Sequence, residues 1–262
     1  MIKLQDQIGN VLELQKTPIR IISLVPSQTE LLVDLGLKES IVGITKFCIH
    51  PLSIKNEKVI VGGTKNINIQ KIKDLQPDII LCNKEENTKE IVELCLQIAP
   101  THVSDIFSIN DSLELIYQYG IIFSCKTLAQ SISEKISFLL NDFKAFVKDK
   151  DSKKVAYFIW KKPWMVAGNN TFINFLLEIN KFDNVYKSEQ RYPEVDLDSL
   201  KGKDDLDYLF LSSEPYPFKA EDKDELQKLF LNQDVLLVDG EMFSWHGSRL
   251  IKAFEYFKTL HK

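Results

Sequence analysis

The amino-acid sequence predicts an α/β protein made of two Rossmann-like lobes, each built on a parallel sheet, with one long helix between them. Three observations support this fold class. Short apolar stretches of strand length alternate with amphipathic stretches of helix length in both halves of the chain, which is typical of parallel sheets with right-handed crossovers. One uninterrupted helical pattern lies at mid-chain. The chain has 262 residues, 44% of them hydrophobic, which is enough for two cores.

The first lobe is expected over residues 18–126. Its first strand, residues 20–25, leads into the polar joint "PSQTE" (26–30) and then into a helix that Gly36 ends. Asn68 and either Ser108 or Asn110 are candidate helix N-caps, because their side chains can accept from backbone N–H groups. Further strands are predicted at 41–47, 58–63, 78–83 and 101–105, and further helices at 68–75, 88–99 and 108–123.

The longest element is a helix over residues 127–150, where apolar side chains recur at helical spacing without a strong breaker. At 1.5 Å per residue, such a helix would be roughly 35 Å long. The second lobe is expected over residues 151–262. Its predicted strands are 155–160, 208–213 and 235–240, and its predicted helices are 171–180, 196–202, 223–230 and 248–262.

Composition narrows the classes of function. A net charge of −4 and a pI near 5.7 give no reason to expect nucleic acid or an anionic membrane as partner. No segment has about 18 uninterrupted apolar residues, so no membrane span is expected. The four cysteines include no C-x-x-C pair and do not have the pattern of a disulfide scaffold. The N-terminus shows no recognisable signal peptide, which favours a cytoplasmic location.

In parallel sheets, ligands bind beyond the carboxyl ends of the strands, so the residues that follow each strand are the candidate binding residues. These loops contain hydroxyls, amides, glycines and all three tryptophans of the chain. Large aromatics beside hydroxyls and glycines suit a flat, partly apolar ligand that also forms hydrogen bonds. The sequence has no nucleophile-elbow, P-loop, zinc-protease or dinucleotide-binding motif, so no enzyme activity and no cofactor are expected.

A site that binds a metal ion directly is an alternative. Cys48, His50, Glu241 and His246 are of the residue types that zinc and iron bind. The spacing of these four residues is not specific to a metal site. The simpler interpretation is that His50 and His246 are each a hydrogen-bonded or surface histidine. The main prediction is therefore that no metal ion is held by the side chains alone.

The stretches "RIISLVPSQTELLVDLG" (20–36), "IVGITKFCIHP" (41–51) and "VGGTKNINIQKIKDLQPDIILCN" (61–83) resemble the substrate-binding proteins of cobalamin and ferric-siderophore ABC importers, the helical-backbone metal receptors. The stretches "KPWMVAGNNTFINFLLEINKFDNVY" (162–186) and "VDGEMFSWHGSRLIKAF" (238–254) are similar to the second lobe of that family. The resemblance is closest to the cobalamin-binding branch. It implies the architecture of the class III periplasmic binding proteins, with the long helix as a rigid backbone.

The resemblance implies a corrinoid, cobalamin-like ligand held in an interlobe cleft, for ABC-type import or for handling inside the cell. Aromatic side chains of both lobes clamp the corrin in those proteins, and an acidic and a basic residue of the last loop also serve them. The matching aromatic or apolar positions are Phe47 in the first lobe and either Trp164 or Met165, Tyr192 and Trp245 in the second. The matching polar and charged positions are Ser27, Gln28, Thr29, Thr64, Asn170, Glu241 and Arg249, with Thr64 in place of an aromatic residue.

Several alternatives stay open at this point. A ferric siderophore or haem could replace the corrinoid, although only Arg249, Lys46 and Lys84 supply positive charge near the expected site. Asp198 matches an acidic residue that docks on the permease, whereas Gln70 stands where the first lobe should carry its acid. The family resemblance implies a periplasmic location, against the cytoplasmic one that the N-terminus favours. A monomer is expected. The remaining alternatives are a metal-cofactor enzyme and a sensory or interaction module without a ligand.

Overall fold

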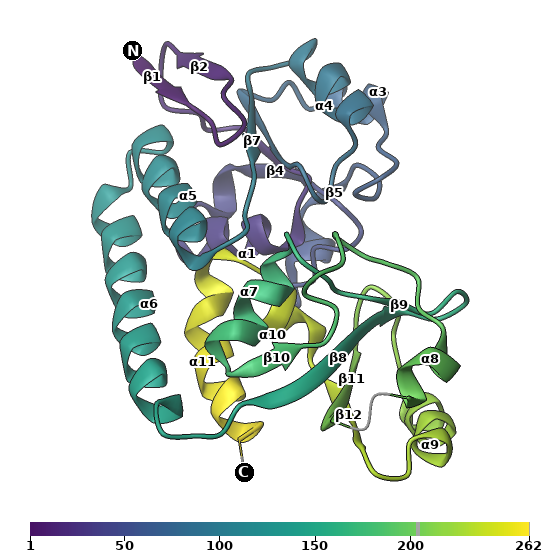
Figure 1. The fold of residues 1–262 in the computed structure, drawn as a ribbon. Helices are drawn as coiled ribbons and strands as arrows, with labels where there is room; N and C mark the ends of the chain where they lie inside the picture. The colour runs from purple at the N-terminus through teal and green to yellow at the C-terminus, as the bar shows by residue number, and fades with distance from the viewer. Residues whose placement is uncertain (203–204, 262) are drawn as a thin grey trace. The chain divides into compact units, whose positions relative to one another are not determined.

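The computed structural model describes residues 1–202 and 205–261, and the chain groups into two compact units. Unit 1 comprises residues 1–138 and 245–251, and unit 2 comprises residues 139–244 and 252–262. The predicted α/β fold with parallel sheets and one long helix is confirmed (Figure 1). The division between the units falls inside that helix, α6 (Lys126–Val147). The predicted domain limits at residues 126 and 150 therefore stay a prediction.

Unit 1 contains a five-stranded sheet in the order β5-β4-β3-β6-β7, and every neighbouring pair is parallel. Because the strands are parallel, their carboxyl ends lie along one edge, where α/β proteins bind ligands. Ser23 at the end of β3 lies opposite Ile44 on one side and Leu81 on the other. The strands are β3 (Ile21–Ser23), β4 (Ile41–Ile44), β5 (Val59–Ile60), β6 (Ile79–Asn83) and β7 (Thr101–Ser104).

Two helices of unit 1, α3 and α5, begin at the caps that the sequence indicates. Asn68 caps α3 by accepting from the backbone N–H of Lys71 at 2.9 Å. Ser108, rather than Asn110, caps α5 through a reciprocal capping box with Asp111. The helices are α1 (Pro26–Asp34), η1 (Lys38–Ser40), α2 (Ile54–Glu57), α3 (Ile69–Asp74), α4 (Lys89–Leu96), α5 (Ile109–Ile122) and η2 (Gly247–Arg249).

A β-hairpin at the N-terminus, β1 (Ile2–Gln5) and β2 (Val11–Leu14), was not predicted. Its turn depends on Asp6, whose buried carboxylate accepts from the N–H groups of Ile8 and Asn10. The same carboxylate also accepts from the N–H of Val103 in β7 at 3.1 Å. The hairpin is therefore fastened to the edge strand of the main sheet by one aspartate.

Unit 2 contains four parallel strands in the order β10-β8-β11-β12, and the short β9 pairs antiparallel with β8 (Figure 1). The part of α6 in this unit packs through Phe143, whose ring lies 5.8 Å from Phe254 and 5.9 Å from Phe257 of α11. The strands are β8 (Lys153–Trp160), β9 (Met165–Val166), β10 (Phe182–Asn184), β11 (Tyr208–Ser212) and β12 (Asp234–Val238). The helices are α7 (Phe172–Ile179), α8 (Leu197–Lys201), α9 (Ala220–Leu229), α10 (Gly240–Ser244) and α11 (Leu250–Thr259).

Among the described residues, no helix combines the length and the apolar character that a membrane crossing requires.

Candidate functional site

The joint between β3 and α1 turns its polar side chains into unit 1. Proline stands at the first position of α1, where its fixed φ suits a helix start, so Ser27, Gln28 and Thr29 lie in the first turn of the helix. All three side chains are buried. Thr29 Oγ1 donates to Ser23 Oγ at 2.8 Å, at the end of β3. The three side chains bond to neighbouring elements of unit 1, and their predicted contact with a ligand stays a prediction.

Gln28 is the centre of a buried hydrogen-bond network that joins α1 to β6, β7 and α5. Its amide nitrogen donates to Ser104 Oγ at 2.6 Å and to the carbonyl of Cys82 at 3.2 Å. Its amide oxygen accepts from the hydroxyl of Tyr119 at 2.8 Å. Burial raises the pKa of Tyr119 well above its usual value, so the phenol keeps its proton and acts as the donor. The network fixes the start of α1 at the carboxyl edge of the sheet.

The loops after β5 and β6 are joined at the same edge. Asn87 Oδ1 accepts from the backbone N–H of Asn83 at 2.9 Å, while its Nδ2 donates to the carbonyl of Thr64 at 3.0 Å. Thr64 is 8% exposed and its hydroxyl is hydrogen bonded to Glu86. Burial raises the pKa of the Glu86 carboxyl, an effect that the positive charge of Lys65 partly offsets. Thr64 is thus part of the loop framework, and its predicted contact with a ligand stays a prediction.

Phe47 is the predicted site residue of unit 1 whose side chain is most open to solvent, with 49% of it exposed. It follows β4, and its ring packs on the turn that follows β5. A Cβ atom added to Gly63 would lie 3.2 Å from the Phe47 ring and 3.5 Å from Lys46 Cε. The Lys46 ammonium lies 5.0 Å from the centroid of the Phe47 ring. The name Lys46–Phe47 platform is used below for this group of four residues: Lys46, Phe47, Gly62 and Gly63.

The segment Trp245–Ile251 lies in unit 1, against α1 and α5. Ser27 Oγ lies 3.3 Å from His246 Nε2, and the N–H of Gly247 donates to Ser112 Oγ at 2.8 Å. Gly247 has a φ of +82°, which favours glycine. Burial lowers the pKa of His246 to about 4, so its imidazole is neutral near pH 7.

Arg249 and Glu30 form a buried ion pair, in which Nε donates to Oε2 at 2.8 Å and the side chains are 4% and 7% exposed. The guanidinium carbon lies 4.9 Å from the centroid of the Trp245 ring. Trp245 in turn contacts His50 edge-on, with 5.3 Å between ring centroids. This stack connects α1 to the loop after β4, which also carries Phe47.

Trp245 and Arg249 group with unit 1, whereas the sequence suggested that they belong to the second lobe. They follow β12, the last strand of unit 2, and were therefore expected to act from the second lobe. The buried ion pair with Glu30 and the backbone bond of Gly247 group this segment with unit 1 instead. Both residues are buried, and their predicted contact with a ligand stays a prediction.

In unit 2, Trp164 packs on aromatic neighbours. Its ring stacks on Phe218, with centroids 5.9 Å apart and planes 8° from parallel, and meets Phe158 edge-on at 5.5 Å. The ammonium of Lys161 lies 5.3 Å from the Trp164 ring centroid. These contacts hold Trp164 in place from three sides. Met165 follows it in β9 and is partly buried.

The structure brings Met165, Asn170 and Tyr192 to neighbouring segments of unit 2. A bridge pairs Met165 with Glu194, and the amide of Asn170 donates to Gln190 Oε1 at 2.6 Å. Tyr192 lies between these two connections and is partly buried. Its ring centroid is 5.6 Å from the guanidinium carbon of Arg191. The predicted clamp residues Met165 and Tyr192 therefore come from segments that run side by side.

Glu241 and Asp198 lie on different elements of unit 2. Glu241 is in the first turn of α10, directly after β12, and its backbone N–H donates to Asp239 at 3.0 Å. Asp198 lies on α8, is exposed, and forms an ion pair with Lys201 at 2.7 Å. The hydrogen bond from Lys201 lowers the pKa of the Asp198 carboxyl. The proposed role of Asp198 in docking on a permease stays a prediction.

The residues of the alternative metal site have other partners. Cys48 Sγ lies 3.1 Å from Thr29 Oγ1 and 3.3 Å from Thr45 Oγ1, and burial raises the pKa of its thiol. His50 contacts Trp245 and His246 contacts Ser27. Over residues 1–202 and 205–261, no group of three or more His, Cys, Asp or Glu side chains is arranged to hold a metal ion.

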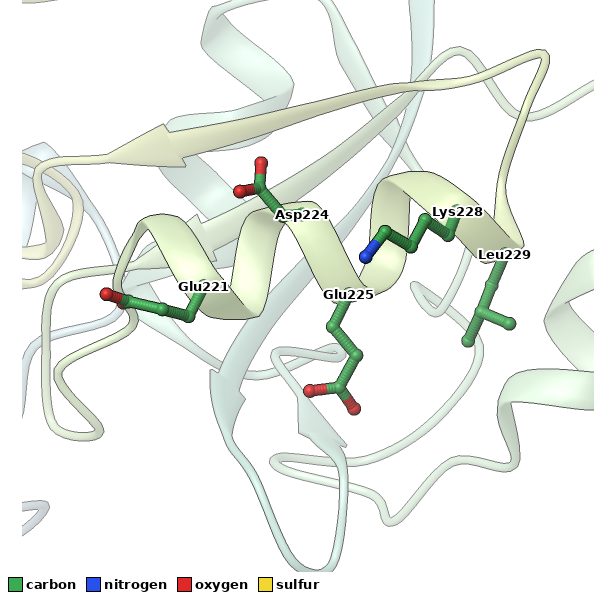
Figure 2. Close-up of a pocket in the computed structure, with 5 residues that line it drawn as sticks. All are labelled: Glu221, Asp224, Glu225, Lys228 and Leu229. Atoms are coloured by element: carbon green, nitrogen blue, oxygen red, sulfur yellow. The ribbon is translucent and has the colours of Figure 1, made fainter.

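A surface concavity lies on α9, and its lining residues include none of the predicted site residues. Figure 2 shows its lining side chains, which all come from this one helix. One of them, Glu225, forms an ion pair with Lys161 at 2.7 Å. A single helix surface with no strand-end residue does not assemble a binding site. The lining residues are Glu221, Asp224, Glu225, Lys228 and Leu229.

Sequence reasoning missed several residues that shape the strand-end edge of unit 1. Glu30 was predicted only as part of the polar joint 26–30, and Tyr119 only as part of the helix 108–123. Asn87 follows Asn83 by four residues, and this pair of amides directly after a strand was a usable signal. No local pattern identifies Arg249 as the partner of Glu30, because the two are 219 residues apart.

Comparison with known proteins agrees with this architecture. One relative is YvrC of Bacillus subtilis (strain 168), an uncharacterized ABC transporter substrate-binding lipoprotein. It is 27% identical to this chain over 190 residues, which are 68% of this chain and 59% of YvrC. A vitamin B12-binding protein of Vibrio vulnificus (strain YJ016) is 31% identical over 113 residues, or 41% of each chain. The chain thus spans less than two thirds of the length of these relatives.

Among solved structures, a periplasmic haem-binding protein from Pseudomonas aeruginosa superimposes with a TM-score of 0.81 at 17% identity, covering 93% of this chain and 92% of that one. At this identity, the likeness shows a shared fold. The family model described as "Periplasmic binding protein" matches residues 21–236, which include the whole parallel sheet of unit 1, α6 and the sheet of unit 2 as far as the middle of β12. The chain therefore belongs to the periplasmic binding protein family.

Proposed function

We propose that this chain is the substrate-binding component of an ABC importer and that its ligand is a cobalamin-like corrinoid. The observation that carries the proposal is the half-exposed Phe47 ring, held on a glycine turn at the edge where parallel sheets bind ligands. An exposed aromatic ring with a fixed orientation loses little entropy when a flat ligand stacks on it. Relatives named as a vitamin B12-binding protein and as an ABC transporter substrate-binding lipoprotein support the same proposal.

In the proposed function, the chain binds its ligand and makes or breaks no covalent bond. The strand-end residues of unit 1 are hydroxyls and amides that bond to one another, an arrangement suited to fixing a surface rather than to activating a nucleophile. The chain would act as a monomer and pass its ligand to a permease, with Asp198 as the proposed docking residue of unit 2. Light scattering after size exclusion tests the monomer, and a dimer at micromolar concentration would contradict it.

The test is calorimetric titration of the purified chain with cyanocobalamin, and in parallel with haemin and a ferric hydroxamate siderophore. We expect sub-micromolar binding of cyanocobalamin. Phe47→Ala should weaken it by about tenfold, because stacking on one aromatic ring contributes about 1–1.5 kcal/mol. Phe138→Ala is the matched control, since Phe138 is also an exposed phenylalanine of unit 1, 71% exposed on α6.

Each outcome has a distinct meaning. Binding of haemin or of the ferric siderophore alone would keep the role in transport and replace the corrinoid. Equal losses in Phe47→Ala and Phe138→Ala would show that Phe47 is not part of the site. If none of the three ligands binds, the proposal is contradicted, and an interaction module without a ligand becomes the better explanation.

A further inference from the structure

The basic side chains described on the strand-end loops of unit 1 include Arg249, Lys84, Lys65 and Lys46, and the first three of these four are already engaged. Arg249 is buried against Glu30. Lys84 forms an ion pair with Asp105 at 2.6 Å, and Lys65 Nζ donates to a backbone carbonyl at 2.7 Å. A cation that is paired in this way has little left to offer to a ligand, because moving it would cost the interaction it already has. The fourth cation is Lys46.

Lys46 is exposed and is held by its backbone and by an aromatic ring. Its N–H donates to the carbonyl of Gly62 at 2.7 Å, and its ammonium lies 5.0 Å from the centroid of the Phe47 ring. Over the described ranges 1–202 and 205–261, no carboxylate lies within ion-pair distance of this ammonium. The Phe47 ring therefore orients a positive charge that no acidic side chain of these residues neutralises.

The geometry of the turn keeps this cation beside the exposed ring. Gly62 has a φ of +129°, and Gly63 lies so close to the ring and to the Lys46 side chain that a Cβ there would touch both. A ligand stacked on Phe47 would therefore have an ammonium near the rim of its ring system. Such an arrangement distinguishes a ligand with an acidic rim substituent from one with a neutral amide at the same place.

We propose that Lys46 determines ligand specificity at the Lys46–Phe47 platform, and that the ligand carries an ionised carboxylate or phosphate on the rim of its flat ring system. This inference rests on the proposed function, because it assumes that Phe47 contacts the ligand. The inference goes beyond the proposed function because it specifies the charge of the ligand, which membership of the family does not predict. In this arrangement Phe47 supplies the stacking surface and Lys46 selects for the anionic group.

The test uses two corrinoids that differ in the charge of their rim. Dicyanocobyrinic acid carries carboxylates where dicyanocobinamide carries amides. Lys46→Gln should weaken binding of the acid by about fivefold, near the upper end for an exposed ion pair, and change binding of the amide by less than about twofold. The difference should shrink between about 50 and 500 mM NaCl because salt screens the attraction. Lys46→Arg should keep the preference.

Lys84→Gln is the matched control, because Lys84 lies in the next loop of the same edge and already pairs with Asp105. It should leave the affinities for both corrinoids unchanged. Equal effects of Lys46→Gln on the two corrinoids, or no effect on either, would overturn this inference and leave the proposed function standing. If the wild-type chain binds neither corrinoid nor haemin, both fail. If it binds haemin alone, haemin and its dimethyl ester become the matched pair.

Discussion

At the scale of single residues, the polar joint between β3 and α1 shows what a side-chain type does and does not predict. The sequence located a run of polar side chains at a helix start, and that location is correct. The sequence did not predict what these side chains bond to, because a hydroxyl or amide in the first turn of a helix can reach either a ligand or a neighbouring strand. The decisive partners are distant in sequence: His246 and Arg249 each lie 219 residues from Ser27 and Glu30, respectively.

Removing the positive charge of the buried ion pair should destabilise the protein strongly. Arg249→Met keeps most of the side-chain volume but leaves the Glu30 carboxylate buried without its 2.8 Å partner, which costs about 3–5 kcal/mol. Urea unfolding at pH 7 measures the free energy of unfolding. The control is Lys3→Met, which breaks the exposed pair with Glu13 and should cost less than about 1 kcal/mol. Similar losses in the two variants would contradict this prediction.

His246 should make the protein less stable in mild acid. Its pKa is about 4 in the folded state, against 6.5 for an exposed imidazole, so the unfolded chain binds more protons between these values. The free energy of unfolding should therefore be constant above about pH 6.5 with respect to this group and fall as the pH drops from 6.5 toward 4. Burial lowers the pKa of His102 as well, so it contributes in the same direction.

The measurement is urea unfolding of wild type and His246→Gln at pH 7 and pH 5. The wild type should lose more stability between the two pH values than the variant, because glutamine does not titrate. The buried His102, which both proteins share, cancels in this comparison. An identical loss in the two proteins would show that His246 does not titrate on unfolding in this range.

At the scale of helices and strands, hydrophobic periodicity predicted α6 and the parallel strands except β10 (Phe182–Asn184), and polar residues before helical patterns predicted the caps of α3 and α5. The strands that escaped, β1, β2, β9 and β10, have two to four residues each, and a pattern that short is hard to tell from a loop. The turn of the N-terminal hairpin depends on Asp6, which also bonds to β7, and β9 pairs with β8 and, through Met165, with Glu194. The glycine pair after β5 was recognised as the end of a strand, but its part in supporting Phe47 depends on the β4 loop that folds over it.

The turn that starts at Gly62 should not tolerate a side chain. A Cβ at this position would lie 2.4 Å from the carbonyl oxygen of Asn66, and the φ of +129° is unfavourable for any other residue. Gly62→Ala should therefore cost more than about 2 kcal/mol in thermal or urea unfolding. Gly202→Ala is the control, since Gly202 has a φ of −75° and its Cβ would meet only an ordinary contact at 3.7 Å. Equal costs would disprove the strain argument.

At the scale of the whole molecule, the order of the elements predicted the fold class, and the resemblance of stretches such as 20–36 and 61–83 predicted the family. It did not predict which unit the segment Trp245–Ile251 joins. That outcome depends on tertiary contacts of Glu30, Ser27 and Ser112, and none of them leaves a local pattern near residue 245. The predicted ligand residues of the two units likewise remain to be tested by titration.

A bound ligand should stabilise the folded chain by mass action. At a cyanocobalamin concentration of about one hundred times the dissociation constant, the free energy of unfolding should rise by about 2.7 kcal/mol. Thermal unfolding followed by fluorescence with increasing ligand measures this as a rising midpoint. The rise should disappear after dialysis and should be smaller for Phe47→Ala at equal ligand concentration. A midpoint that does not respond to ligand would contradict binding to the native state.

The buried pair of Glu30 and Arg249 has a consequence for synthesis on the ribosome. The two partners are 219 residues apart in the chain, so at about 5–20 residues per second Glu30 emerges about 10–45 s before Arg249 exists. Once Ser104 has been added, every strand of the unit 1 sheet has been made, but α1 still lacks the segment that covers it. Unit 1 therefore completes its folding only after residue 251 has been translated.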